Sequence, residues 1–136
     1  NLPMLIHCSE PVGHQYPGKG DSKIKMINTF VNNFPNNKII LAHWGGGVPF
    51  YELMPEIKEA FKNVYYDSAA SSFLYDANVF SNVIKLVGVE KILFGSDYPV
   101  ISQNRVLGDL KKNTLTDSQM QSILQTNFRN LIAPNP

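Results

Sequence analysis

The sequence predicts an α/β fold in which parallel strands alternate with helices. Four short apolar runs recur at intervals of roughly 30 residues, and a segment with helical periodicity follows each of them. The runs are apolar on both faces, which is typical of parallel strands covered by helices. Four such units make half of an eight-unit barrel, which needs about 250 residues, but they also suffice for a small open doubly wound sheet. The repeat alone leaves both architectures open.

The first unit starts with a strand at residues 4–8, which ends in His7 and Cys8. A loop rich in proline and glycine follows at residues 15–20. Asp21 or Ser22 is expected to cap the next helix, which ends before Pro35. Its apolar residues recur at helical spacing and are Ile24, Ile27, Phe30, Val31 and Phe34.

The second and third units have the same order. The second strand, residues 38–43, is apolar up to its histidine, and three glycines come shortly after it. Its helix is expected to bury one apolar face, formed by Phe50, Leu53, Met54, Ile57 and Phe61. The third strand, residues 64–69, contains Asp67. Asp76 can cap the next helix and Gly88 can end it. The inward residues of that helix are Val79, Phe80, Val83, Ile84 and Val87.

The fourth strand, residues 92–97, ends in Asp97, and Pro99 prevents further ladder hydrogen bonding. A short helix near residues 106–110 and a longer closing helix complete the unit. Thr116 and Gln119 have the spacing of a capping box. The closing helix carries its apolar face on Met120, Ile123, Leu124, Phe128 and Leu131.

Composition and net charge restrict the kinds of molecule that the protein is expected to bind. The 136 residues, 43% of them hydrophobic, suit a single domain covering residues 1–136. The net charge of +1, with no basic run longer than Lys111–Lys112, argues against nucleic acid and anionic lipid and favours a small molecule. The apolar runs are shorter than the roughly 20 residues of a membrane span. The single cysteine, Cys8, cannot form an internal disulfide, which favours a cytoplasmic protein.

The sequence begins almost directly on a strand, without an initiator methionine. A native amino terminus is usually a loose, polar segment. We therefore expect residue 1 to be an interior point of a longer polypeptide. A half-barrel would expose two sheet edges, so a homo-oligomer is also expected.

Three residues of metal-ligand type occupy equivalent places, because His7, His43 and Asp97 lie at the ends of strands one, two and four. The carboxyl ends of parallel strands meet at one edge, so these side chains can share a pocket. Two imidazoles and a carboxylate can hold a divalent metal and leave positions for water and substrate. Singly, each residue has a structural explanation, since strand-end histidines are often only hydrogen-bonded and Asp97 could be a turn residue. Together they predict a metal site.

The strand pattern does not decide which neighbouring residues face the predicted metal pocket. Side chains along strand three point alternately to the two faces of the sheet, so either Asp67 faces the pocket, or Tyr66 and Ser68 face it. The glycines 45–47 do not have the spacing of a dinucleotide or P-loop motif. They predict a tight turn that lets the backbone pass close to the pocket.

Four stretches carry a resemblance to a known family: Ile-His-Cys with Glu10 following, residues 40–46 (Ile-Leu-Ala-His-Trp-Gly-Gly), residues 64–67 (Val-Tyr-Tyr-Asp) and residues 92–99 (Ile-Leu-Phe-Gly-Ser-Asp-Tyr-Pro). With them the chain resembles the amidohydrolase superfamily, in the amidohydrolase-related branch that includes aminocarboxymuconate-semialdehyde decarboxylase. The Gly-Ser-Asp-Tyr-Pro stretch together with the two strand-end histidines is the most specific part.

The resemblance implies that these units are strands five to eight of a TIM-type (β/α)8 barrel, the carboxyl-terminal half. It implies that His7 is a metal ligand, that His43 is an acid/base or second ligand, and that Asp97 binds metal and moves the proton of its water. The family's first-strand His-x-His pair has no counterpart in this sequence. Either that pair lies in a missing amino-terminal half, or the chain binds metal differently.

The implied function is a metal-dependent hydrolase that uses a zinc-like ion to activate water against a small carbonyl or carboxylated substrate. A metal-dependent decarboxylase of the same branch is the close alternative. The expected substrate contacts are Glu10, His14, Tyr16, Trp44 and Asp67. The alternative from another class is a protein without enzymatic activity, either an inactive half-barrel or a small-molecule-binding α/β domain.

Overall fold

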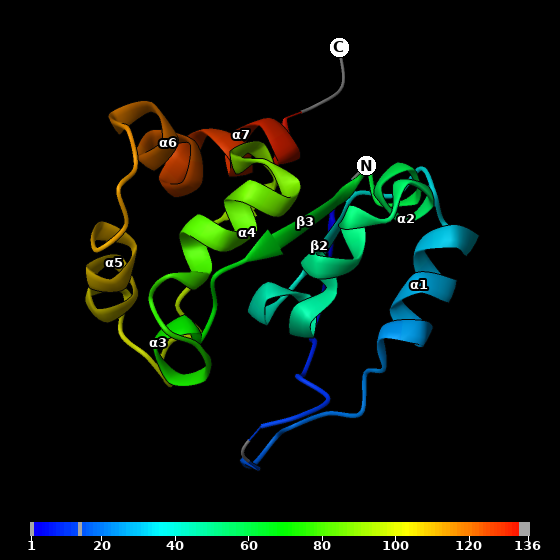
Figure 1. Cartoon of the computed structure of the whole chain (residues 1–136), viewed down its shortest axis with the longest axis horizontal. Coiled ribbons are helices and arrows are strands. Elements are labelled where there is room, and N and C mark those ends of the chain that lie inside the picture. The colour runs from blue at the N-terminus through cyan, green and yellow to red at the C-terminus, as the bar shows by residue number, and fades with distance from the viewer. Residues whose placement is uncertain (1, 14, 134–136) are drawn as a thin grey trace.

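The computed structural model describes residues 2–13 and 15–133 of the chain. Its four strands are β1 (Met4–Ile6), β2 (Ile39–Leu41), β3 (Val64–Asp67) and β4 (Ile92–Leu93). They form one sheet in the order β1-β2-β3-β4, and every neighbouring pair is parallel (Figure 1). The predicted α/β class with parallel strands is confirmed.

Helical segments connect the strands, and in the described part of the chain four more follow β4. They are α1 (Ile24–Asn33), η1 (His43–Leu53), α2 (Pro55–Ala60), α3 (Ser71–Leu74), α4 (Val79–Val87), η2 (Val89–Lys91), α5 (Gln103–Lys111), α6 (Asp117–Gln121), η3 (Ser122–Thr126) and α7 (Asn127–Ile132). In Figure 1, α1 lies to the right of the strands and α5 to the left. None of the helices in the described ranges is both long and apolar enough to cross a bilayer.

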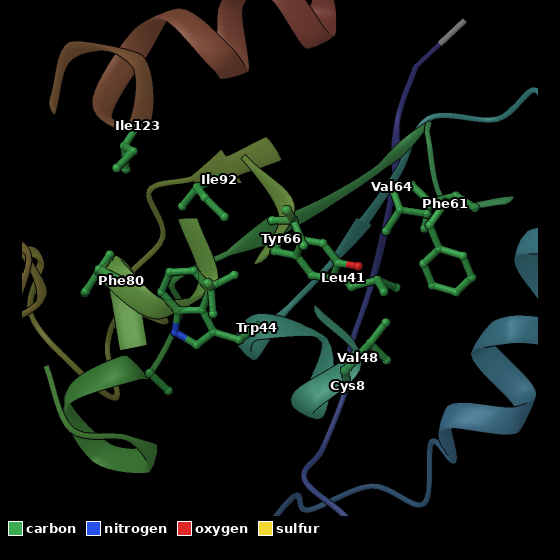
Figure 2. Packing of buried hydrophobic residues seen from close by; sticks show 14 of the residues in the cluster. Cys8, Leu41, Trp44, Val48, Phe61, Val64, Tyr66, Phe80, Ile92 and Ile123 are labelled. Atoms are coloured by element: carbon green, nitrogen blue, oxygen red, sulfur yellow. The ribbon is translucent and has the colours of Figure 1, made fainter. Parts of the chain in front are cut away.

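Alternation along the strands divides the apolar residues between the two faces of the sheet. The larger cluster packs one face against the helices (Figure 2) and includes Ile39, Leu41, Val64, Tyr66 and Ile92 from the strands. The smaller cluster lies on the other face and joins Ile40, Tyr65 and Leu93 to Leu131 of α7. Leu5 of β1, in register with Ile40, is 65% exposed. On this second face of the sheet, the part formed by β1 is therefore the least covered by other side chains.

The predicted helix after the second strand is wrong in its position. Phe50, Leu53 and Met54 were expected to face the core but are 65%, 59% and 45% exposed. The α-helix begins only at Pro55, which stands in its first turn, where proline is tolerated because its missing N–H has no partner there. Before it, η1 contains a left-handed stretch that changes which side chains face inward, so Val48 and Glu52 are buried instead.

The helix ends follow the sequence in part. The capping box at Thr116 is present, with Gln119 N–H donating to its hydroxyl at 3.2 Å. The predicted caps at Asp21 or Ser22 are wrong, because Lys23 is the N-cap and Ser22 Oγ donates to the carbonyl of His7. The cap expected at Asp76 is also wrong. Asn78 occupies that position, and Asp76 accepts its backbone N–H at 2.9 Å.

The outer edge of β4 is covered by the carboxyl-terminal helices. Phe94 N–H donates to Ile123 O at 3.2 Å, and Asn127 Nδ2 donates to Ile92 O at 2.8 Å. Lys38 Nζ also donates to the carbonyl of Leu131 at 2.7 Å, which ties the end of α7 to the start of β2. Outward-facing backbone groups of β4 are thus already hydrogen-bonded within the chain.

Candidate active site

Residues that follow three different strands line one cavity at the carboxyl edge of the sheet. His7 comes after β1, His43 after β2 and Asp97 after β4. The cavity has a volume of about 310 Å³, and its other lining residues are Tyr16, Pro17, Gly18, Ala70, Phe73, Leu74 and Val100. A larger depression of about 610 Å³ lies between α3 and α5, but it contains none of the three strand-end residues. The smaller cavity, which contains all three strand-end residues, is therefore the candidate active site.

The two histidines form a hydrogen-bonded chain whose proton positions can be deduced. His43 is buried, and its Nδ1 lies 3.1 Å from Ala69 O, which can only accept, so Nδ1 carries the proton. In the neutral ring Nε2 is then an acceptor, and it lies 3.2 Å from His7 Nδ1, which must donate. His7 Nε2 in turn accepts from Ser9 Oγ at 3.1 Å. Each ring is thus held in one tautomer by its neighbours.

A left-handed backbone turn brings His43 to the cavity. His43 and Trp44 both have φ of 55°, and Gly45 to Gly47 continue the positive φ values. A Cβ on Gly46 would lie 2.6 Å from Ser9 O, so the turn packs directly against the chain that leaves β1. This is the tight turn that the glycine run predicts.

Two more residues at this edge have left-handed backbone without being glycine. Ala70 has φ of 57° and Asp97 has φ of 68°, and both line the cavity. Such conformations cost about 1–3 kcal/mol each and concentrate at functional sites. The concentration of strain around one cavity supports a functional role for it.

Asp67 supports the turn from beneath. Its Oδ1 accepts the backbone N–H of His43 at 3.0 Å and that of Ala69 at 2.9 Å. Burial raises the pKa of this carboxyl group above its ordinary value of 3.8, although the two backbone hydrogen bonds act in the opposite direction. The register puts Asp67 on the same face of the sheet as Leu93, but it does not belong to the cavity lining.

The other expected substrate contacts have different positions. Trp44 is 1% exposed; its Nε1 donates to Ser71 Oγ at 2.7 Å and its ring meets Phe80 edge to face (Figure 2), so it is a core residue. Tyr16 lines the cavity, whereas Glu10 does not. His14 lies outside the described residues.

The apolar wall of the cavity was not predicted from the sequence. Phe73 and Leu74 belong to α3, a four-residue helix after a run of small residues, and Val100 follows Pro99. Two adjacent apolar side chains in a four-residue helix give too few positions for a periodic pattern. The only signal was their place after the third strand, where catalytic loops of parallel folds lie.

The two histidines of the predicted donor set have a spacing that suits a divalent metal. Two nitrogen ligands of a tetrahedral zinc, each about 2.0–2.1 Å from the ion, lie about 3.4 Å apart. The 3.2 Å between His43 Nε2 and His7 Nδ1 is close to that value. A metal bound there would replace the proton that His7 Nδ1 carries in the hydrogen-bonded chain. The bond from His43 Nδ1 to Ala69 O is the usual support of a ligating imidazole. Within residues 2–13 and 15–133, however, no three His, Cys, Asp or Glu side chains come together as a metal-binding group.

The chain has parallel strands with helical crossovers and a pocket at the carboxyl edge of its sheet, which is the edge where active sites of parallel α/β folds lie. The model of the amidohydrolase family (Amidohydro_2) matches residues 1–131, and the chain belongs to this family. The predicted family resemblance is thereby confirmed. The comparison with curated proteins gives no match.

Solved structures share the fold. 5-Carboxyvanillate decarboxylase LigW from Sphingomonas paucimobilis has a TM-score of 0.74 at 15% identity, over 96% of this chain and 49% of that one. An uncharacterised TIM-barrel protein from Bordetella bronchiseptica has a TM-score of 0.69 at 17% identity, over 96% and 45%. A dihydroxybenzoic acid decarboxylase from Polaromonas sp. JS666, solved with bound manganese, has a TM-score of 0.65 at 19% identity, over 79% and 37%. The chain thus corresponds to half or less of each similar protein.

Proposed function

We propose that residues 1–136 are a single domain and the carboxyl-terminal half of a metal-dependent barrel enzyme, which decarboxylates a small aromatic acid. The observation that carries the proposal is the composition of the cavity. His7, His43 and Asp97 form its polar part, and Tyr16 and Phe73 are aromatic groups in its wall. Aromatic walls suit a flat ring, and a cavity of about 310 Å³ suits a small one.

The proposed cofactor is a divalent metal, zinc or manganese, held by His7, His43 and Asp97 together with ligands from the missing amino-terminal half. When bound, such an ion polarises carboxylate or phenol oxygens of the substrate. The manganese in the similar Polaromonas decarboxylase supports a divalent ion. The single cysteine supports a cytoplasmic location, and a homo-oligomer remains part of the proposal.

The chain's own residues have separate roles in this reaction. Decarboxylation breaks the bond between the ring and the carboxyl carbon, releases CO2 and puts a proton on the ring carbon. We assign that proton transfer to Asp97, whose place in the cavity lining supports the role. His43 would hold the metal through Nε2, and its hydrogen bond to Ala69 O keeps this nitrogen directed to His7.

Hydrolysis is the second candidate, because the same imidazole and carboxylate groups can activate a water molecule. Asp97 then takes the proton of that water, and a carbonyl carbon is attacked instead of a ring carbon being protonated. The products distinguish the two reactions. Decarboxylation releases CO2 from an aromatic acid, whereas hydrolysis cleaves an ester or an amide.

The test uses the full-length protein loaded with Mn²⁺ or Zn²⁺ and given 2,6-dihydroxybenzoate, 5-carboxyvanillate, and an aryl ester and amide. We expect CO2 release, and a loss of at least about 100-fold in kcat for Asp97→Asn, the lower range for a general acid/base. Asp117→Asn, an exposed acid in the first turn of α6, is the matched control and should keep normal turnover. Turnover of the ester or amide alone would favour hydrolysis, and equal activity of both variants would contradict the role of Asp97.

A further inference from the structure

The carboxylate of Glu10 joins two tyrosines that come from separate segments of the chain. Its Oε1 accepts from Tyr75 OH at 3.1 Å, and its Oε2 accepts from Tyr16 OH at 3.4 Å. Tyr16 belongs to the connection between β1 and α1, and Tyr75 directly follows α3. In Figure 1 this connection and α3 both lie at the lower end of the view. Glu10, Tyr16 and Tyr75 are called the Glu10 cluster below.

The Glu10 cluster lies where two walls of the cavity meet. Tyr16 lines the cavity from the β1–α1 connection, and Phe73 and Leu74 line it from α3, immediately before Tyr75. The rings of Tyr16 and Phe73 meet edge to face with centroids 6.4 Å apart. Glu10 itself is not part of the lining, so it can act on a bound molecule only through the aromatic rings that it positions.

In the Glu10 cluster both tyrosine hydroxyl groups donate hydrogen bonds to the carboxylate of Glu10. An ionised carboxylate only accepts, so each phenol must donate its proton. Burial raises the pKa of Tyr75, and the negative charge of Glu10 raises it further. The pKa of Tyr16 is raised first by burial and also by Glu10, against an opposing hydrogen bond from Ser9. The two phenols therefore remain protonated, and the bonds are of the charge-assisted kind.

The backbone around Glu10 is fixed independently of its side chain. A Cβ on Gly46 would lie 2.6 Å from Ser9 O and 3.5 Å from Glu10 N, so η1 packs closely on this segment. Ser9 Oγ also accepts the backbone N–H of Gly20 at 2.9 Å. Because the backbone is held from both sides, the Glu10 carboxylate is a fixed point against which Tyr16 is placed.

We propose that Glu10 is a positioning residue that sets the width of the aromatic part of the cavity, and so its selectivity for a flat aromatic substrate. The inference rests on the proposed function in one respect, namely that the substrate ring packs against the wall that Tyr16 and Phe73 form together. Loss of the carboxylate removes the hydrogen-bonded link between Tyr16 and Tyr75, whereas the ring contact between Tyr16 and Phe73 stays. The substrate ring then gains freedom, which weakens binding while the groups that move protons stay in place.

The test compares Glu10→Ala, Glu10→Gln and Tyr75→Phe in the full-length protein with the matched control Glu56→Ala, an exposed acid in the first turn of α2. The first readout is hydrogen–deuterium exchange. We expect exchange several-fold faster in Glu10→Ala for peptides covering residues 15–20 and 71–75, and unchanged exchange in peptides covering β2 and β3. Glu10→Gln, which can still bond to both phenols, and the control should stay within about twofold of the unmodified protein.

The second readout is kinetic. With the aromatic acid that the protein decarboxylates, we expect KM to rise about fivefold in Glu10→Ala and Tyr75→Phe, with kcat within about twofold. Unchanged exchange in Glu10→Ala, or equally faster exchange throughout the protein, would overturn the proposal. If none of the acids is turned over, the proposed function fails, whereas the exchange experiment still decides whether Glu10 positions Tyr16.

Discussion

At the scale of single residues, the turn that carries His43 depends on two glycines in different surroundings. Both have left-handed backbone, with φ of 61° at Gly46 and 93° at Gly47. Around Gly46 a Cβ would meet Ser9 O at 2.6 Å, whereas around Gly47 it would meet no atom within 4 Å. The pair therefore separates the cost of backbone strain from the cost of a collision.

Gly46→Ala is expected to lower the free energy of unfolding by about 3 kcal/mol or more, since strain and collision add. Gly47→Ala should lower it by only about 1–2 kcal/mol, because strain alone applies. Urea denaturation of both variants checks the difference. Equal losses would mean that the packing of η1 on the segment after β1 is not as close as the structure has it.

Asp67 gives a prediction on pH. Burial raises its folded pKa above 3.8, so the folded protein holds its proton to a higher pH than the unfolded chain does. Its contribution to stability is therefore complete below pH 3.8 and is lost as pH rises through the folded pKa. Asp67→Asn keeps an oxygen for the two backbone N–H groups but cannot ionise.

We accordingly expect the protein to lose stability relative to Asp67→Asn as the pH rises from about 4 to about 7. Unfolding free energies of the two proteins, measured by urea denaturation across this range, give the difference directly. A difference that stays constant, or that changes in the opposite direction, would contradict the buried, proton-retaining state of Asp67.

At the scale of secondary-structure elements, a buried ionic network connects η1, β3 and the end of η2. The side chain of Glu52 is fully buried; it accepts from Tyr66 OH at 2.6 Å and from Lys91 Nζ at 2.7 Å. Lys91 Nζ also donates to Phe61 O at 2.9 Å. The ring of Tyr66 meanwhile borders Gly45, so the network supports the turn that carries His43.

Lys91→Met should lower the free energy of unfolding by about 3–5 kcal/mol, because it leaves a carboxylate buried without a cation. The exposed pair of Lys62 and Glu59, with 3.0 Å between Nζ and Oε1, is the matched control. Lys62→Met should cost less than about 1 kcal/mol. Adding Glu52→Gln to Lys91→Met should recover part of the loss. A cost for Lys91→Met as small as that of the control would contradict the account.

Some features of these elements could be predicted from the sequence and others could not. Strand positions and the Thr116 capping box were predictable because they depend on residues close in the chain. The orientation of η1 was not, because it depends on the Asp67 carboxylate accepting His43 N–H across 24 positions. The three strand-end residues could be proposed from parallel topology alone. The role of Glu10 could not, since Tyr75 lies 65 positions away.

At the scale of the whole molecule, the two edges of the sheet are unlike. Among the described residues β1 pairs with β2 alone, and Leu5 on it is 65% exposed. In β4 the outward carbonyl of Ile92 instead accepts from Asn127 Nδ2 at 2.8 Å, and the same amide group donates to Val89 O of η2 at 2.7 Å. An open edge is a template for pairing with another chain.

Asn127→Ala should therefore increase self-association of the 136-residue chain, because it leaves the carbonyl of Ile92 without this donor. Two lost hydrogen bonds should also lower the free energy of unfolding by about 2 kcal/mol. Sedimentation velocity over a range of concentrations measures the association. Asn130→Ala, in the exposed part of α7, is the control, and identical sedimentation of the two variants would contradict the capping role.

The whole account depends on the strand ends forming one metal-binding site. Calorimetric titration of the metal-free full-length protein with Mn²⁺ tests this most directly, using His7→Ala, Asp97→Asn and the control Asp117→Asn. We predict that the first two lower the affinity at least about 100-fold, since even groups that only support ligands cost 10–100-fold, and that the control binds normally. Equal affinity in all three variants would contradict the assignment of His7 and Asp97 to a metal site.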